Sequence, residues 1–364
     1  MTLSRATLER RIALALEQAP PGIPILVGAC GCGRTTLLRR LADRRRGSAV
    51  YLDVERAATT PERFLKALSV AVSAVGRHPE QEAGNARAAY EATLAVLGHA
   101  TGHAGQPITF LLDEVLELKT FESFPAVRDV LPSLVVALGR SANRFILATR
   151  FTSRARRLLV VENGPPILVP VPNLTPLEVA EAIGRTEPSC SDLAPAVHAL
   201  SDGRPSYFTA LCDQLAAMDR AGGGDPVSAL VALFAPGGRL ASQCAASYEL
   251  RLHHARGYGA LKAIVQILAD EEPLTLTEVA RRLGRTPGST RDYLSWLEDV
   301  DLVSAEDKRY GLADPLLRLW VRLYCRPSPP SEDDVARETQ AYAMTRLAPR
   351  GMSSGPGRQP WART

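Results

Sequence analysis

The chain has 364 residues, of which 46% are hydrophobic and 23% charged, with a formal net charge of +4 at pH 7. This composition is typical of a folded globular protein, and the length suffices for two or three domains. The small net charge argues against nucleic-acid binding through overall charge, and no apolar run reaches the roughly 18 residues that span a bilayer. The amphipathic start lacks the apolar core of a secretion signal, which predicts a cytoplasmic protein without a membrane partner.

The first half of the chain alternates short apolar strands with helices. We expect helices over residues 5–18, 35–44, 61–75, 85–99 and 126–139, and strands over 23–27, 49–53, 108–112, 144–149 and 166–169. Continuous apolar strands between helices are typical of a parallel sheet that is covered on both faces. We therefore predict an α/β fold in which residues 1–172 form the first domain.

A glycine-rich loop, residues 28–36 with the sequence GACGCGRTT, joins the first strand to the next helix. It matches the phosphate-binding pattern G-x-x-x-x-G-K-[ST] except that Arg34 replaces the lysine. The loop contains three glycines, Gly28, Gly31 and Gly33. Without side chains they let backbone N–H groups converge on phosphates, while Thr35 offers a hydroxyl to Mg²⁺ and Thr36 lies deeper in the helix start. The loop predicts binding of ATP with magnesium.

Arg34 is the one departure from that pattern. Arginine keeps the positive charge of lysine but is bulkier and planar, so it does not reproduce the same contacts with the β- and γ-phosphates. Only four of the 43 basic residues are lysines, so the exchange agrees with the arginine bias of the chain. We expect a modestly lower nucleotide affinity and slow hydrolysis.

Two carboxylates, Asp113 and Glu114, follow the apolar strand 108–112. An aspartate at the tip of a strand can hold magnesium through water, and the next glutamate can polarise a water molecule for attack on the γ-phosphate. Together with the glycine loop in the same predicted sheet, the pair is identified as a Walker B motif, and we expect Glu114 and Arg34 to be the catalytic residues.

The second half of the chain is predicted to be mostly helical. Residues 173–255 are expected to form a helical domain, with a helix start at Thr175, Pro176 and Glu178. Residues 256–325 contain helical patterns over 260–269, 275–283 and 289–297 and strand patterns over 301–303 and 310–312, which together predict a winged helix-turn-helix. Residues 326–364 are expected to form a linker, a peripheral helix over 332–347 and a disordered tail.

These motifs resemble those of the archaeal-type P-loop ATPases, a family that is also found in bacteria and is related to the AAA+ and STAND groups. The resemblance covers most of residues 5–325 and is carried by Val27–Leu38, Asp113-Glu114, Asp202–Tyr207, Tyr258–Leu268, Thr275–Leu283, Tyr293–Glu298 and Tyr310–Trp320. It implies a P-loop NTPase sheet, a helical lid and a C-terminal winged helix. The chain departs from the family pattern at Arg34 and after Thr149.

The resemblance also implies roles for residues outside the two motifs. Gly203 and Pro205 would lie near the nucleotide, and Arg204 would sense it. Thr149 ends the fourth strand, where related ATPases place a polar residue that senses the γ-phosphate. Four arginines follow it, Arg150, Arg154, Arg156 and Arg157. Each is long enough to reach a phosphate in the same chain or across a subunit boundary, but we favour a surface basic cluster in so arginine-rich a chain.

The sequence thus predicts an ATP-binding, magnesium-dependent ATPase that acts as a nucleotide-controlled switch. One alternative is a DNA-binding transcriptional regulator with structural or no nucleotide, and a second is a signalling or defence scaffold. The turn and third helix of the winged helix offer Arg285, Arg291 and Ser295 to double-stranded DNA. Acidic residues crowd the far side, so contact with another protein, or with a second copy of the chain, stays open for this domain.

Overall fold

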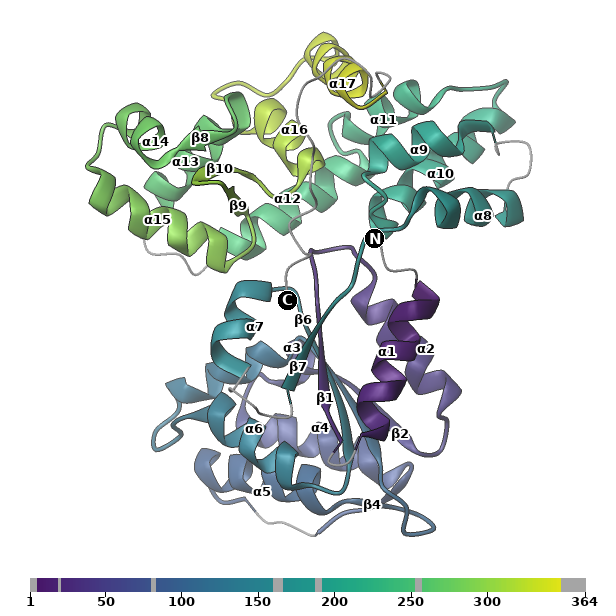
Figure 1. Ribbon diagram of the computed structural model, residues 1–364, viewed down its shortest axis with the longest axis vertical. Helices are drawn as coiled ribbons and strands as arrows, with labels where there is room; N and C mark the ends of the chain where they lie inside the picture. The colour runs from purple at the N-terminus through teal and green to yellow at the C-terminus, as the bar shows by residue number, and fades with distance from the viewer. Residues whose placement is uncertain are drawn as a thin grey trace. The chain divides into compact units, whose positions relative to one another are not determined.

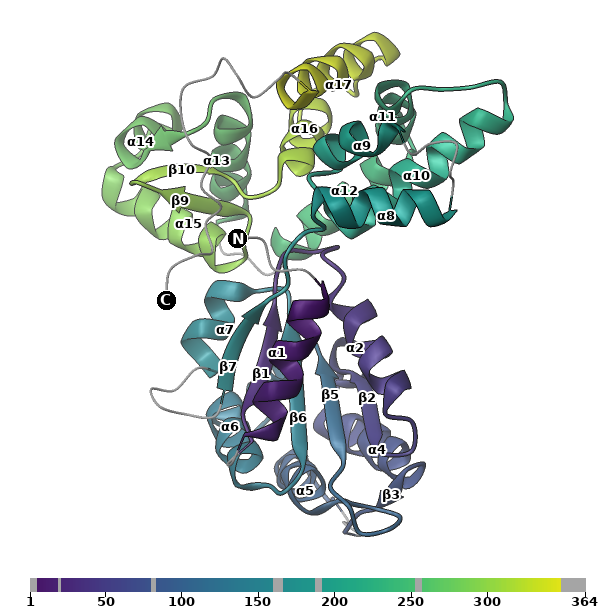
Figure 2. The same cartoon turned by 45° about the vertical axis from the view of Figure 1, so that its right-hand side comes forward.

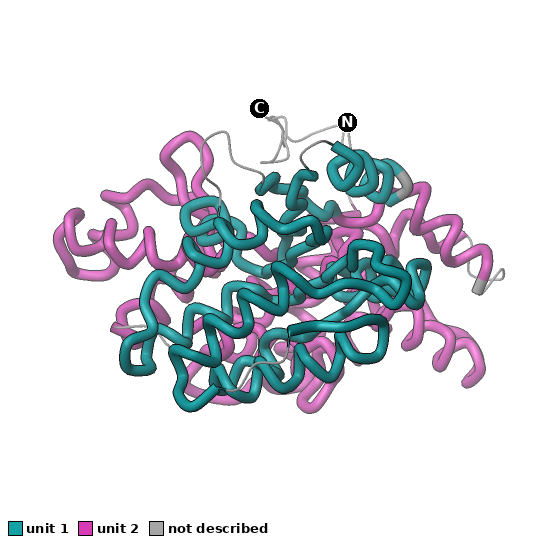
Figure 3. The backbone as a smooth tube through the Cα atoms, turned by 90° about the horizontal axis from the view of Figure 1, so that it is seen from below, with its two compact units in different colours: residues 1, 3–29, 33–172 teal, residues 2, 30–32, 173–364 magenta. Residues whose placement is uncertain are grey.

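The computed structural model describes residues 5–18, 21–79, 83–159, 166–186, 192–252 and 257–347, and the predicted tail beyond residue 347 lies outside these ranges. Two compact units divide the chain, as Figure 3 shows. Unit 1 comprises residues 3–29 and 33–172, and unit 2 comprises residues 30–32 and 173–364. Among the described helices, none combines the length and the apolar character needed to cross a membrane.

Unit 1 is built on a five-stranded parallel sheet with the strand order β2-β5-β6-β1-β7 (Figures 1 and 2). The strands are β1 (Ile23–Val27), β2 (Ala49–Asp53), β5 (Thr109–Asp113), β6 (Arg144–Thr149) and β7 (Pro166–Pro170). Every residue of β1 and β5 is buried, which explains why these strands read as continuous apolar runs. The predicted α/β class with a parallel sheet is confirmed. A separate two-stranded ribbon joins β3 (Gly76–Arg77) and β4 (Thr101–Gly102).

Helices cover both faces of this sheet. They are α1 (Arg5–Glu17), α2 (Arg34–Arg44), α3 (Val54–Ala57), α4 (Pro61–Ser73), α5 (Ala86–His99), α6 (Val130–Arg140) and α7 (Thr152–Leu159), with a 3₁₀ segment η1 (Val115–Ser123) after β5. In Figure 1, α1 and α2 lie on one face, and α4, α5 and α6 lie on the other. Because the five strands are parallel, their carboxyl ends lie at the same edge of the sheet. The glycine-rich loop and the two predicted carboxylates follow strands at this edge.

Helix α6 begins four residues later than the sequence pattern predicts. Ala126 and Asp129 both have positive φ, 62° and 49°, which is incompatible with a helix that starts at Ala126. Pro132 falls in the first turn of the observed helix, where a backbone N–H has no intrahelical partner to lose. The chain turn before α6, not the proline, sets its start.

From residue 173 on, the described part of unit 2 starts with the helices α8 (Pro176–Thr186), α9 (Ala194–Ser201), α10 (Pro205–Arg220), α11 (Pro226–Phe234) and α12 (Arg239–Leu252). The predicted start of α8 is confirmed, because the Glu178 backbone N–H donates to Thr175 Oγ1 (3.2 Å) and the Thr175 N–H donates to Glu178 Oε2 (2.9 Å). This reciprocal pair satisfies two N–H groups that the helix itself leaves without partners.

The rest of unit 2 combines helices with a small antiparallel sheet of strand order β8-β10-β9. Its elements are α13 (Tyr258–Asp270), β8 (Leu274–Thr275), α14 (Leu276–Leu283), α15 (Pro287–Asp299), β9 (Val303–Glu306), β10 (Arg309–Leu312), α16 (Pro315–Tyr324) and α17 (Glu332–Leu347). Thr275 and Glu278 form a capping box at the start of α14, and Gly284 ends it with φ 67°. Asp314 is the N-cap of α16, and its side chain accepts hydrogen bonds from two backbone N–H groups.

Candidate functional site

The glycine-rich loop connects β1 directly to α2. Gly31 and Gly33 have φ angles of 79° and 92°, in the left-handed region that favours glycine. Gly33 is the N-cap of α2, and no side chain caps the first N–H groups of this 11-residue helix. A helix start without a side-chain cap and with a positive dipole end is suited to an anion. The local geometry therefore has the features that phosphate binding requires.

Arg34, the first residue of α2, turns its side chain toward the end of β5. Its Nη2 donates to Glu114 Oε1 (3.1 Å), and its Nη1 donates to the carbonyl oxygen of Ala29 (3.3 Å). The side chain is 7% exposed. The cation that replaces the expected lysine is thus paired with the carboxylate that is expected to be catalytic, although the two lie 80 positions apart in the sequence.

Asp113 is the last residue of β5, and its two oxygens have different surroundings. Oδ2 accepts a hydrogen bond from the hydroxyl of Tyr51 on the neighbouring strand β2 (3.1 Å). Burial and the charge of Asp113 raise the pKa of Tyr51 to about 12, so the phenol stays a donor at neutral pH. Oδ1 is buried and has no hydrogen-bond partner among the described residues. Such an oxygen is suited to a ligand, directly or through water.

Magnesium fits the oxygen donors at this edge of the sheet. Mg²⁺ prefers carboxylate, hydroxyl and water oxygens, and usually keeps several waters. The buried Oδ1 of Asp113 is a carboxylate oxygen of this kind, and Thr35 contributes a half-buried hydroxyl from the first turn of α2. These two residues would hold the ion, which would neutralise phosphate charge when bound.

Glu114 lies just after β5 in a left-handed conformation, with φ 54°. Both carboxylate oxygens are occupied: Oε1 accepts from Arg34, and Oε2 accepts from the backbone N–H of Arg150 (3.0 Å). The Arg150 Nε also lies 3.2 Å from Oε2. Each carboxylate oxygen can accept a second hydrogen bond, so Glu114 can still accept one from a water molecule, in an orientation that the two arginines fix.

Arg150 differs from the surface cluster that the sequence favoured. It is buried, with a side chain 8% exposed, and it pairs with both Glu114 and Glu55. Burial alone would lower its pKa, but the charges of Glu114 and Glu55 raise it overall. Arg156 and Arg157 are exposed, as expected for a surface cluster, and Arg154 is half-buried with its guanidinium 5.3 Å from the Phe151 ring. The surface interpretation is therefore wrong for Arg150.

Thr149 and Arg204 are the remaining predicted site residues. Thr149 is the last residue of β6 and pairs in register with Val27, the residue before the glycine loop. It is fully buried, and its hydroxyl accepts from the Phe151 N–H (3.3 Å). Arg204 belongs to unit 2, where it is 2% exposed and donates to the carbonyl oxygen of Cys30 (3.0 Å). The sensor roles of both residues stay predictions, as do the nucleotide contacts of Thr36, Gly203 and Pro205.

Sequence reasoning missed Tyr51 and Glu55, which contact residues of this charged cluster, and it named Arg150 but favoured a surface position for it. Tyr51 and Glu55 flank Asp53 at the end of β2, which pairs with β5. Their position beside Asp113 and Glu114 depends on the strand order, which spacing in the sequence does not supply. The sequence could have indicated a buried position for Arg150, because this residue directly follows the polar end of a buried strand.

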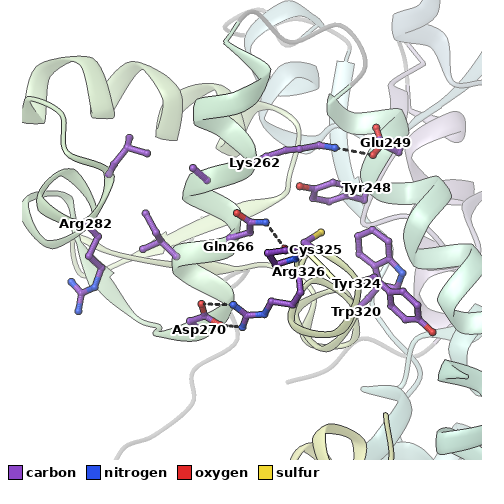
Figure 4. Close-up of a pocket in the computed structure, with 14 residues that line it drawn as sticks. Tyr248, Glu249, Lys262, Gln266, Asp270, Arg282, Trp320, Tyr324, Cys325 and Arg326 are labelled. Carbon is purple, nitrogen blue, oxygen red and sulfur yellow. Dashed lines mark hydrogen bonds and ion pairs between the residues drawn. The ribbon is translucent and has the colours of Figure 1, made fainter. Parts of the chain in front are cut away.

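A recess of about 820 Å³ lies in unit 2 between α12, α13 and the end of α16 (Figure 4). Trp320 packs against Tyr248 and Tyr324, with ring centroids 5.2 and 5.9 Å apart. Ion pairs join charged lining residues, Lys262 with Glu249 and Arg326 with Asp270. None of the predicted site residues lines this recess. We interpret it as the boundary between packed helices and not as part of the candidate site.

No protein-family model and no curated protein sequence matches the chain. Among solved structures, the Walker-type ATPase PABY2304 of Pyrococcus abyssi is similar over 88% of this chain and 98% of that protein, with a TM-score of 0.63 and 15% sequence identity.

Two further solved structures are similar at lower scores. The Aeropyrum pernix ORC1 protein, solved in complex with DNA, is 16% identical over 95% of both chains with a TM-score of 0.47. The Thermotoga maritima RuvB Holliday junction branch migration motor is 15% identical over 85% of this chain and 92% of that one, with a TM-score of 0.45. Of the three, only the Pyrococcus protein exceeds a TM-score of 0.5. At this level of identity the likeness shows the fold alone: the chain has a P-loop NTPase fold.

Proposed function

We propose that the chain binds ATP with magnesium at the loop 28–36 and acts as a nucleotide-controlled switch with slow hydrolysis. The backbone N–H groups around Gly28, Gly31 and Gly33 and the start of α2 hold the phosphates. Arg34 supplies positive charge, Thr35 and Asp113 hold magnesium, and Glu114 orients the attacking water. That water attacks the γ-phosphorus, its proton passes toward Glu114, and the bond to the β–γ bridging oxygen breaks to release ADP and phosphate.

The pairing of Arg34 with Glu114 is the observation that carries this proposal. It brings the loop residue and the strand-end carboxylate to 3.1 Å in a buried setting, as a site that uses both on one triphosphate requires. The same pairing supports slow turnover. Two cations draw on the charge of the Glu114 carboxylate, which makes it a weaker acceptor for the proton of the attacking water, and a γ-phosphate attracts Arg34 away from it. Nucleotide binding and release of Glu114 are therefore linked.

ATPase turnover tests the proposal. Glu114→Gln keeps the size of the side chain but cannot take a proton, so we expect turnover to fall about 100-fold or more while nucleotide affinity stays within about threefold. Glu91→Gln is a matched control, because Glu91 is exposed on α5 and pairs with Arg87 of the same helix. Equal turnover in wild type and Glu114→Gln would refute Glu114 as the catalytic residue.

DNA binding through residues 256–325 is a second candidate function, and we propose that these residues form a winged helix. The observation that favours DNA is a group of exposed cationic side chains at the start of α15, at its first turns and at the β9–β10 turn: Arg285, Arg291, Lys308 and Arg309. Asp292, Glu306 and Asp307 are also exposed there, so the net charge of this face is small. A protein-docking or scaffold role remains the alternative for it.

Fluorescence anisotropy with a DNA duplex at several salt concentrations tests this second function. Arg291→Ala and Arg309→Ala should each weaken DNA binding. Each should also reduce the steepness of the plot of log binding constant against log salt concentration by about one. Salt-dependent binding that persists unchanged in the double variant would exclude this face as the DNA reader.

A further inference from the structure

The tip of the glycine loop, residues 30–32, belongs to unit 2 and is held there by two hydrogen bonds to its carbonyl oxygens. The Ser206 backbone N–H donates to Gly31 O (3.1 Å), and Arg204 Nη1 donates to Cys30 O (3.0 Å). The fit is close, because a Cβ atom at Gly31 would lie 2.1 Å from Ser206 Oγ. The start of α10 therefore fixes the conformation of the loop tip.

Arg204 is itself held by a buried carboxylate. Its Nη1 lies 2.9 Å from Asp314 Oδ2, and the Tyr207 hydroxyl donates to the same oxygen (2.7 Å). The Arg204 guanidinium lies 5.1 Å from the centroid of the Tyr207 ring. All three side chains are at most 5% exposed. Burial and the charge of Asp314 raise the pKa of Tyr207 well above its usual value, so its hydroxyl remains a donor.

Asp314 also fixes the start of α16. Its Oδ1 accepts hydrogen bonds from the backbone N–H groups of Leu316 (3.1 Å) and Leu317 (3.2 Å), whereas its Oδ2 accepts one from Tyr207 and forms the ion pair with Arg204. One carboxylate thus divides its two oxygens between a helix cap and the arginine. The orientation of Arg204 is set by the first turn of a helix that lies more than 100 positions further along the sequence.

We propose that Arg204 and Asp314 are positioning residues that orient the N–H groups of the loop tip for phosphate, an inference that rests on the proposed nucleotide site. In a planar trans peptide, the C=O and N–H groups point in opposite directions. Holding the Cys30 carbonyl therefore orients the Gly31 N–H, and holding the Gly31 carbonyl orients the Cys32 N–H. Because Asp314 neutralises Arg204, this arginine acts through loop geometry and not as a charge offered to the nucleotide.

Asp314→Asn separates the two roles of the carboxylate. The asparagine retains one oxygen for the N–H groups of Leu316 and Leu317 but presents an NH₂ group, which accepts no hydrogen bond, to Arg204. Asp225→Asn is the matched control, because Asp225 caps α11 in the same way and is exposed. Arg204→Met removes the contacts with Cys30 O and Asp314 at similar side-chain volume. Arg204→Lys should partly restore them, since one ammonium group can donate to both Cys30 O and Asp314.

The thiol of Cys32 reports directly on the loop tip without nucleotide. It is 1% exposed, so it should react with maleimide only when the tip loosens. We expect labelling of Cys32, located by peptide mass spectrometry, to be about tenfold faster in Asp314→Asn and Arg204→Met, and slower again in Arg204→Lys. Asp225→Asn should match wild type, and Cys212 on α10 should label at the same rate in all variants. If Cys32 in Asp314→Asn were labelled at the same rate as in wild type, the inference would be overturned.

A titration with fluorescent ADP and magnesium distinguishes this inference from the proposed function. We expect the Kd to rise about tenfold in Asp314→Asn and to stay unchanged in Asp225→Asn. Absence of binding by wild type would refute the proposed function and the positioning role with it. Normal binding by wild type with an unchanged Kd in Asp314→Asn would refute the positioning role alone.

Discussion

Two buried arginine–carboxylate clusters, one in each unit, differ in how many cations the carboxylate has. Glu114 in unit 1 is shared by two arginines, Arg34 and Arg150. Asp314 in unit 2 has Arg204 as its one ion-pair partner within the described residues. A carboxylate with two cations can release one and remain paired, whereas a carboxylate with one cation cannot. We therefore propose that the cluster in unit 1 exchanges one arginine with a ligand and that the cluster in unit 2 stays closed.

The surroundings of the two clusters support the same distinction. Glu55, which also pairs with Arg150, has a side chain that is 42% exposed, so that end of the unit 1 cluster reaches solvent. Glu114 occupies a left-handed conformation just after a strand, a feature that is frequent at functional sites. Asp314 caps a helix and lies among residues that are almost fully buried. Charge pairs of similar length therefore have different surroundings in the two units.

Removal of one arginine from each cluster should give the largest contrast. Arg204→Met leaves Asp314 buried without a counter-ion, which typically costs about 3–5 kcal/mol and would lower the Tm of unit 2 by about 10 °C. Arg34→Met leaves Glu114 paired with Arg150, so we expect a decrease of about 3 °C or less. Differential scanning calorimetry gives both values.

Tryptophan fluorescence assigns the transitions in that experiment. No tryptophan precedes residue 173, and Trp296 and Trp320 lie in α15 and α16 of unit 2, so the unfolding signal of these two residues reports unit 2. Arg40→Met, at an exposed position of α2, serves as a control for the loss of an arginine as such. Equal decreases in Tm for Arg204→Met and Arg34→Met would contradict the distinction between the two clusters.

A smaller effect, on ATPase turnover, is expected when Arg34 is exchanged for lysine, the residue that the loop pattern specifies. The planar guanidinium of Arg34 bonds Ala29 O and Glu114 at once, and a lysine ammonium holds this pair of partners less rigidly. Arg34→Lys should therefore release Glu114 more readily and raise steady-state turnover about tenfold, which corresponds to about 1.4 kcal/mol in the barrier. Arg40→Lys should leave turnover unchanged. A turnover of Arg34→Lys at or below wild type would show that the pocket is adapted to arginine.

The part of the site that is local in sequence could be predicted. The residues of the loop 28–36 are consecutive, and their glycine spacing and position between a strand and a helix indicate their conformation. Asp113 and Glu114 were found in the same way, from a buried strand that ends in two carboxylates. The start of α16 could also be predicted, because an aspartate followed by proline, as at Asp314, is a typical helix start.

The contacts between distant elements could not be predicted. Arg150 reaches Glu114 because β6 and β5 are neighbours in the sheet, and Tyr51 reaches Asp113 because β2 pairs with β5. The sequence indicates that these strands share a sheet but not their order. Arg204 likewise meets Asp314 through the packing of α10 and α16 in unit 2, and no local pattern in the sequence connects the two residues.

The most direct test of the account is a titration of the wild-type chain with fluorescent ATP and ADP analogues, with and without magnesium. The account predicts saturable binding that is at least about tenfold tighter with magnesium for the triphosphate, because Asp113 and Thr35 then contribute through the ion. Asp113→Asn should remove that magnesium dependence while the chain remains folded. Binding that does not saturate, or that is indifferent to magnesium in wild type, would contradict the central claim that this loop is a functional nucleotide site.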